Sequence, residues 1–113
     1  MVSLFSYGTL QQPEVQLGTF GRLLEGYPDA LSGYFLVPLT ISNPNVVALS
    51  GAAVHSIACR SPGALDAIPG VVFDITASEL AQADAYEVDV YGRVEEALVS
   101  GRRAYVHVGP PIA

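Results

Sequence analysis

Residues 70–87 read GVVFDITASELAQADAYE, and this stretch decides how the chain is organised. Residues 71–75 are rich in β-branched and aromatic side chains and predict a buried strand that begins after a glycine. Thr76 and Glu79 then have the spacing of a capping box, in which each side chain accepts a hydrogen bond from an otherwise unpaired backbone N–H. The stretch therefore predicts a strand followed directly by a helix that covers residues 80–86 or extends to 87.

Strand-like runs separated by turn residues fill most of the rest of the chain. The alternation after the helix predicts a hairpin, with Ser100-Gly101 at its turn. The expected strands cover residues 2–6, two short strands with a turn between them within 23–37, residues 52–59, residues 91–99 and residues 103–108.

The remaining segments predict a short helix and a loop. Pro13 suits the first position of a helix over residues 14–17, which a following glycine closes. Residues 38–51 contain the turn former Asn43-Pro44-Asn45 and predict mostly loop.

The composition is that of one folded domain over residues 1–113. Half of the residues are hydrophobic and 14% are charged, against roughly 25% charged in average domains. Such a chain can bury a hydrophobic core, whereas a disordered chain shows the opposite balance. Together with the pattern of elements, this predicts a strand-rich α+β domain with one well-defined helix.

The charged residues exclude several classes of function. The net charge is −6 and the chain has no Lys, so a nucleic-acid partner is not expected. The lack of Lys also excludes a Schiff base or an amine nucleophile on a side chain. An anionic substrate must therefore be bound by backbone N–H groups or by an arginine. The arginines are Arg22, Arg60, Arg93, Arg102 and Arg103.

The sequence also carries signals about the compartment. Cys59 is the single cysteine, which excludes an intrachain disulfide and fits a reducing environment. The first residues lack the basic segment and sustained apolar stretch of a signal peptide. No stretch approaches the ~18 apolar residues of a membrane span. We therefore expect a cytoplasmic protein without membrane insertion.

Glu87 is the strongest candidate for a catalytic residue. Residues four and seven apart on a helix lie within about 40° and 20° of one another around the axis, so Leu80, Ala83 and Glu87 share its apolar face. A carboxylate on that face is withdrawn from water, which raises its pKa and makes it a better base near neutral pH. In the alternative, the helix ends at Tyr86 and Glu87 points into solvent.

The sequence Tyr7-Gly8-Thr9-Leu10, after the first expected strand, is the second candidate. Glycine permits backbone conformations that turn consecutive N–H groups toward one point. Such a nest binds a carboxylate or a developing oxyanion without a basic side chain. The alternative is an ordinary turn after the strand.

Three motifs together resemble a known family. Tyr-Gly-Thr-Leu at 7–10, Asp-Ala-Tyr-Glu at 84–87 and Tyr-Gly-Arg at 91–93 are similar to motifs of the gamma-glutamylcyclotransferase-like superfamily. Within it, the chain resembles small bacterial and plant proteins related to gamma-glutamylamine cyclotransferase. The resemblance extends over residues 4–108, although nothing within 38–69 matches a motif.

The resemblance implies a fold and a role for each matching residue. The fold is a small mixed β-barrel flanked by helices. No metal or other cofactor is required, and the partner is a small-molecule gamma-glutamyl substrate. The implied substrate-binding residues are Tyr7, Gly8, Thr9, Leu10, Tyr91 and Arg93, and Glu87 is the general base.

The implied reaction uses a nucleophile that the substrate itself carries. Glu87 takes a proton from the substrate's α-ammonium group, and the freed amine attacks the γ-carbonyl to close a five-membered ring. This transferase or lyase chemistry gives 5-oxoproline and releases the attached amine or amino acid, whose nitrogen can receive the proton back from Glu87. The sequence leaves open both the leaving amine and the choice between a monomer and a homodimer.

The other reactive residues have structural interpretations. Cys59 is expected to be a small buried residue rather than a nucleophile. His55 and His107 fall in predicted strands without zinc-site spacing, and Glu95-Glu96 is expected at a solvated strand edge. Arg93 either pairs with an acid or binds the substrate carboxylate.

Two other functions stay open from the sequence alone. A domain of the same fold can bind a small molecule or a protein without catalysis, because a fold does not fix an activity. A related enzyme can hydrolyse a γ-glutamyl compound, which releases glutamate instead of 5-oxoproline.

Overall fold

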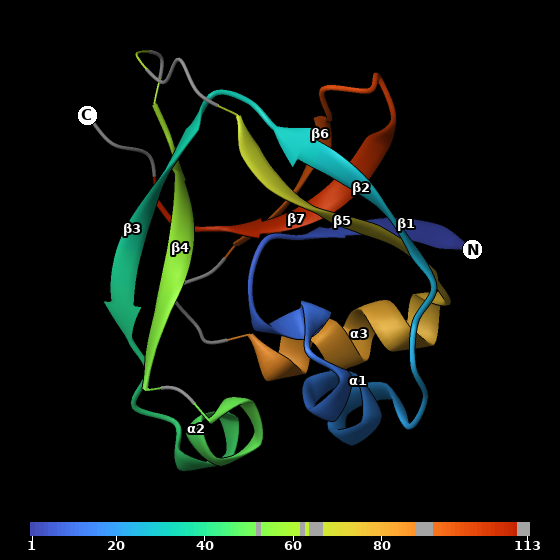
Figure 1. Ribbon diagram of the computed structural model, residues 1–113, viewed down its shortest axis with the longest axis vertical. Helices are drawn as coiled ribbons and strands as arrows, with labels where there is room; N and C mark the ends of the chain where they lie inside the picture. Colours follow the sequence, from blue (N-terminus) through green and yellow to red (C-terminus); the bar gives the residue numbers. More distant parts are fainter. Residues whose placement is uncertain (52, 62, 64–66, 88–91, 111–113) are drawn as a thin grey trace.

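The computed structural model is a mixed α+β structure in which helices pack on one face of a sheet and a two-stranded ribbon packs on the other (Figure 1). It describes all residues except 52, 62, 64–66, 88–91 and 111–113, and at residue 39 it describes the backbone alone. The sheet contains, in order across it, β2 (Gly26–Leu31), β5 (Ile68–Ile75), β1 (Val2–Ser6), β7 (Arg103–Val108) and β6 (Gly92–Ala97). The ribbon pairs β3 (Tyr34–Thr40) with β4 (Val54–Arg60), and the helices are η1 (Thr9–Gln11), α1 (Pro13–Phe20), α2 (Pro44–Ser50) and α3 (Ala77–Tyr86).

Strand β1 lies at the centre of the sheet and positions residues 7–10, the candidate loop, which follow it. It pairs antiparallel with β5, where Ser6 lies opposite Val71, and parallel with β7, where Leu4 lies opposite Tyr105. Because successive side chains of a strand point to opposite faces, Leu4 packs in the core on one face and Phe5 in the core on the other. The candidate loop therefore leaves the sheet from its most enclosed strand.

Two hydrophobic cores lie on the two faces of the sheet. The first joins the sheet to the helices, and α1 and α3 are seen beneath the sheet in Figure 1. The second joins the sheet to the ribbon. The buried members of the first are Leu4, Leu10, Val15, Ile41, Val46, Phe73, Ile75, Leu80, Ala83 and Tyr86, and those of the second include Phe5, Leu31, Tyr34, Ala58, Val72 and Val106. No helix in the described part of the chain is long and apolar enough to cross a membrane.

The start of α3 confirms the predicted capping box. The Thr76 hydroxyl accepts a hydrogen bond from the Glu79 N–H, and the Glu79 carboxylate accepts one from the Thr76 N–H, both at 3.0 Å. Glu79 also forms a bidentate ion pair with Arg22, which follows α1, at 2.7 and 2.8 Å. The hydrogen bonds from Arg22 and Thr76 lower the pKa of Glu79 to about 2. The capping residue therefore also fastens α3 to the end of α1.

The prediction of a loop over residues 38–51 is wrong. Strand β3 continues to Thr40, and α2 covers Pro44–Ser50. The Asn43 side chain accepts hydrogen bonds from two backbone N–H groups of the first turn, and Pro44 occupies the first helical position, where its missing N–H does no harm. Asn43-Pro44-Asn45, which the sequence indicates as a turn, therefore begins a helix. The close packing of Leu49 on Gly18 of α1 then stabilises this short helix.

The other expected elements are found, although some differ in extent or arrangement from the expectation. The first strand and the paired strands after α3 are confirmed, and α1 runs three residues past the predicted end, to Phe20 before a left-handed Gly21. The two strands expected within residues 23–37 exist, but they pair with different partners, β2 with β5 and β3 with β4. The described strands form an open sheet and a separate ribbon rather than a closed barrel.

We predict that Gly70→Ala strongly destabilises the fold beside the candidate loop. An added Cβ would lie 2.3 Å from the carbonyl oxygen of Ser6 and 2.6 Å from the Phe5 ring. Such overpacking costs about 1–3 kcal/mol of unfolding free energy, measurable by chemical denaturation. Gly92→Ala is the matched control, because the nearest atom to its added Cβ is the Val108 carbonyl oxygen at 4.0 Å. Equal stabilities of the two variants would contradict the prediction.

Candidate active site

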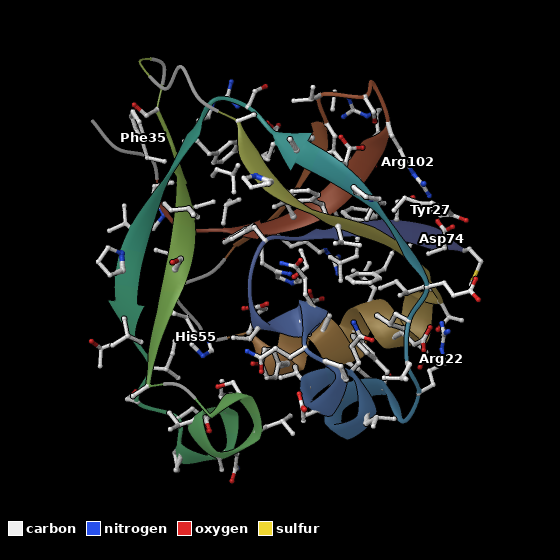
Figure 2. All side chains as sticks on the ribbon, in the orientation of Figure 1. Arg22, Tyr27, Phe35, His55, Asp74 and Arg102 are labelled. Carbon is white, nitrogen blue, oxygen red and sulfur yellow. The ribbon has the colours of Figure 1, made fainter. Side chains whose placement is uncertain are left out.

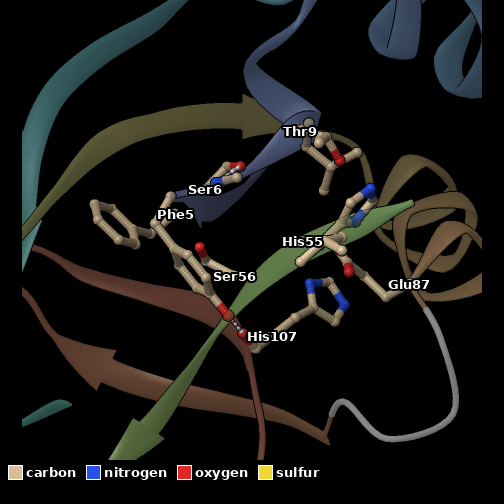
Figure 3. A pocket seen from close by; sticks show the side chains of 11 residues that line it. Phe5, Ser6, Thr9, His55, Ser56, Glu87 and His107 are labelled. Atoms are coloured by element: carbon tan, nitrogen blue, oxygen red, sulfur yellow. Dashed lines mark hydrogen bonds between the residues drawn. The ribbon is translucent and has the colours of Figure 1, made fainter. Parts of the chain in front are cut away.

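A cavity of about 270 Å³ opens where the loop after β1, strand β4, strand β7 and the end of α3 meet. Figure 3 shows His55, Glu87 and His107 pointing into this space from β4, the end of α3 and β7. The lining residues are Phe5, Ser6, Tyr7, Gly8, Thr9, Leu10, Val54, His55, Ser56, Glu87 and His107. The structure therefore brings together the two sequence features, residues 7–10 and Glu87, which lie about 80 positions apart in the chain.

Glu87 lines the cavity although α3 ends one residue before it. Its N–H still donates to the Ala83 carbonyl at 3.0 Å, but its φ and ψ of −68° and 146° are extended. Both sequence alternatives are thus partly right: the helix stops at Tyr86, and the carboxylate nevertheless faces the cavity rather than open solvent. Withdrawal from water, and then the negative charge of Asp84, raise the pKa of Glu87 to about 7.

The loop at residues 7–10 leads directly into the short helix η1. Gly8 has φ and ψ of −132° and −145°, so it does not adopt a left-handed conformation. Its N–H donates to the Ser6 hydroxyl at 3.4 Å, whereas the N–H groups of Thr9 and Leu10 have no hydrogen-bond partner within the described part of the chain. The first N–H groups of a helix lack intrahelical partners and attract negative charge. The loop therefore offers two free donors beside the cavity.

A chain of hydrogen bonds fixes the loop to the other walls. The Thr9 hydroxyl bonds to the Tyr86 hydroxyl at 2.5 Å, and Tyr86 also bonds to the side chain of Ser50. Ser50 in turn bonds to Nε2 of His55 at 3.1 Å. Tyr86 is buried, and its withdrawal from water raises its pKa, so it stays a neutral hydroxyl. The loop, α3, α2 and β4 are thus joined side by side around the cavity.

The Tyr7 hydroxyl connects the sheet with the ribbon. It donates to the His107 carbonyl at 2.6 Å and accepts from the Ala58 N–H at 3.0 Å. The same ribbon residue accepts from the Gly109 N–H at 2.8 Å. The side chain of Tyr7 therefore joins β4 to β7.

Arg93 does not line the cavity. Its guanidinium pairs with Asp84 at 2.5 Å and lies over the Tyr105 ring, 5.1 Å from the centroid. Of the two sequence alternatives, pairing with an acid is the one that the structure displays. Tyr91, the other residue of this motif, lies outside the described residues.

The other arginines are also paired away from the cavity. In Figure 2, Arg102 lies near Tyr27 and Asp74 at the edge of the sheet, far from His55. An anionic group in the cavity would consequently meet backbone N–H groups rather than a guanidinium in the described lining. The remaining pairs are Arg22–Glu79, Arg60–Glu96 and Arg103–Glu95.

Sequence reasoning missed two histidines of the cavity. His107 is buried, and its Nε2 lies 2.8 Å from Asp84, while His55 belongs to the hydrogen-bond chain described above. Alternation predicted both residues in strands, but it cannot tell which strand face meets the end of α3. Across the described residues, no cluster of three or more His, Cys, Asp or Glu could hold a metal ion. Cys59 is buried, as predicted.

Comparison with known proteins assigns the chain to a family. The model of a family described as gamma-glutamyl cyclotransferase, AIG2-like, matches residues 4–110. The chain belongs to this family. A comparison with curated proteins gave no match.

Solved structures share the fold of this AIG2-like chain. A solution structure of At5g39720.1 from Arabidopsis thaliana has a TM-score of 0.73 and 21% identity, over 96% of this chain and 68% of that one. A second, of At3g28950.1 from the same plant, has a TM-score of 0.69 and 21% identity, over 96% and 61%. The uncharacterized protein PH0828 from Pyrococcus horikoshii has a TM-score of 0.61 and 17% identity, over 96% and 78%. At these identities the likeness shows the fold alone.

We predict that Tyr7→Phe costs about 1–3 kcal/mol of unfolding free energy. The loss of the hydroxyl leaves the buried Ala58 N–H and the His107 carbonyl without this partner, and unsatisfied groups of this kind carry such a penalty. Chemical denaturation measures it. Tyr27→Phe is the control, because Tyr27 is 56% exposed and its change should stay within about 0.5 kcal/mol. A Tyr7→Phe protein as stable as the control would show that the bridge does not stabilise the fold.

Proposed function

We propose that this protein is a cyclotransferase that releases 5-oxoproline from a γ-glutamyl amine or γ-glutamyl amino acid. The family supports the reaction class. The observation that carries the proposal is the meeting of Glu87, with a pKa raised to about 7, and the free loop N–H groups in one cavity. A base with a pKa near the working pH combines a useful carboxylate fraction with a strong affinity for protons.

In this proposal Glu87 activates the nucleophile that the substrate carries. The carboxylate accepts a proton from the α-ammonium group, and the α-nitrogen then forms a bond to the γ-carbonyl carbon. The bond from that carbon to the leaving nitrogen breaks. The α-nitrogen starts with three protons and ends as a lactam with one, so two protons pass through the site to the leaving nitrogen, which departs as an ammonium group. No redox partner is involved.

The loop at residues 7–10 supplies the complementary contacts. The N–H groups of Thr9 and Leu10 suit either the substrate α-carboxylate or the oxyanion that forms at the γ-carbonyl. Either contact holds the flexible γ-glutamyl chain in a bent form, with its amine near its own carbonyl. Since Thr9 is fastened to Tyr86, immediately before Glu87, the base and the donors keep a constant spacing.

The test is a turnover assay with a panel of γ-glutamyl amines and γ-glutamyl dipeptides. We expect 5-oxoproline, detected by mass spectrometry, from the wild type and a loss of about 10²–10⁴-fold in Glu87→Gln. The preferred member of the panel would identify the class of leaving amine. Glutamate as the product would instead indicate hydrolysis, and ligand-induced thermal shifts without product would indicate a binding domain; either result contradicts the proposal.

We predict that kcat/KM falls tenfold per pH unit below about pH 7. Glu87 must be a carboxylate to accept the proton, and its pKa in the free protein, raised to about 7, sets the midpoint of the acid limb. Initial rates between pH 5 and 9 measure it. An acid limb centred near 4.5, the ordinary value for this carboxyl group, would show that Glu87 is not desolvated or is not the base.

We also predict that Glu87→Gln stabilises the folded protein above neutral pH. Because the pKa of Glu87 is raised on folding, the folded state retains its proton between about pH 4.5 and 7 while the unfolded state has lost it. The wild type therefore loses stability as the pH rises through this window, and the variant does not. Denaturation at pH 4, 6 and 8 should show a difference that is small at pH 4 and grows with pH. A constant difference would contradict the assignment.

A further inference from the structure

A line of three side chains leads from the surface to the cavity wall. The Arg93 guanidinium pairs with one carboxylate oxygen of Asp84 at 2.5 Å. The other oxygen of Asp84 lies 2.8 Å from Nε2 of His107. Arg93 comes from β6, Asp84 from α3 and His107 from β7, so the line also joins three elements. Of these three side chains, His107 alone lines the cavity, where Glu87 is also found.

This arrangement determines which nitrogen of His107 is free. A carboxylate that already accepts from Arg93 acts as an acceptor for the imidazole, so Nε2 carries the proton and Nδ1 keeps its lone pair. Nδ1 has no hydrogen-bond partner within the described part of the chain. It also keeps some contact with solvent, since the one fully buried side-chain nitrogen or oxygen without a partner in that part is Oγ1 of Thr19. His107 is 6% exposed and borders the cavity, so we assign that contact to the cavity.

His107 is held firmly in this orientation. Its carbonyl oxygen accepts the hydrogen bond from the Tyr7 hydroxyl at 2.6 Å, which fixes the backbone, and Asp84 fixes the ring. Burial lowers the pKa of His107 from 6.5 and outweighs the opposing effect of Asp84. The ring is therefore neutral at pH 7 and presents an acceptor to the cavity.

We propose that His107 is a second proton acceptor of this site: its Nδ1 binds the α-amino group of the γ-glutamyl substrate, and Asp84 and Arg93 are positioning residues for its ring. The inference rests on the proposed function. Ring closure removes two protons from the α-nitrogen. In the described lining, Glu87 offers a carboxylate and His107 a free ring nitrogen for them, whereas Nε2 of the other histidine, His55, is bonded to Ser50. Glu87 takes the first proton before attack. His107 takes the second from the nitrogen of the tetrahedral adduct, and both protons leave on the departing amine.

Kinetics of four variants separate this role from a structural one. We expect His107→Asn to lower kcat/KM by about 10²-fold or more, within the range of general acid–base catalysis. Asp84→Asn and Arg93→Met should each lower it by about tenfold, mainly in kcat, because they free the ring without removing it. Arg103→Met is the matched control, since Arg103 also forms an exposed ion pair, with Glu95 between β7 and β6, but neither residue lines the cavity or contacts His107. It should retain wild-type activity. Circular dichroism and denaturation verify that each variant folds.

Nitrogen-15 NMR of the histidine side chains tests the same inference without turnover. The chain has two histidines, so His55 is an internal reference. We expect the Nε2–H tautomer of His107 in the wild type, a mixture of tautomers in Asp84→Asn, and a shift of the Nδ1 resonance when a γ-glutamyl substrate is added to the inactive Glu87→Gln protein.

The outcomes distinguish the two proposals. If the wild type gives no 5-oxoproline, both fail. If the wild type is active and Glu87→Gln is not, but His107→Asn stays within about twofold of wild type, the proposed function stands and the inference about His107 is overturned. An Nδ1–H tautomer in the wild type, or an Nδ1 resonance that substrate does not move, would overturn it as well.

Discussion

The Tyr7 hydroxyl holds together the two β-layers between which the site lies. It joins the N–H of Ala58, in the ribbon, to the carbonyl of His107, in the sheet. Tyr7 is the first residue after the central strand β1. Its side chain therefore sets the distance between β4 and β7 and also fixes the start of the candidate loop. The helix layer closes the remaining side, because Thr9 bonds to Tyr86 at the end of α3. The cavity exists where these constraints meet.

The position of Glu87 has an energetic cost that the proposed function explains. Withdrawal from water and the nearby charge of Asp84 make the charged carboxylate unfavourable, and the proposed function needs that charged form as the base. Such a cost is commonly found at functional sites, since a protein optimised for stability alone would place a neutral residue there. The capping box and the Arg22 ion pair at the other end of α3 hold the helix that bears this unfavourable group.

The sequence predicted the parts of the fold that depend on local chemistry. Thr76 and Glu79 specify a helix start within four residues. The spacing from Leu80 through Ala83 predicts Glu87 on the inner face only if the helix continues to it, whereas in the structure the helix ends at Tyr86 and Glu87 reaches the cavity from an extended backbone. The helix at Pro44 was missed because Asn-Pro begins both turns and helices, and its stability depends on a distant contact between Leu49 and Gly18. The separate partners of β2 and β3 were likewise missed, because pairing between distant strands leaves little trace in either segment. The sequence indicates only a strand residue at His107, since its contact with Asp84 joins two elements that lie apart in the chain.

The pKa of Glu87 tests the central claim most directly. Carbon-13 NMR of the labelled side-chain carboxyl groups, followed from pH 3 to 9 and assigned by comparison with Glu87→Gln, measures it without knowledge of the substrate. The account predicts a titration midpoint of about 7. In Asp84→Asn the midpoint should be lower, because removal of a nearby negative charge favours the carboxylate. A midpoint near 4.5 in the wild type would mean that Glu87 is solvated, and the site would then lack its base.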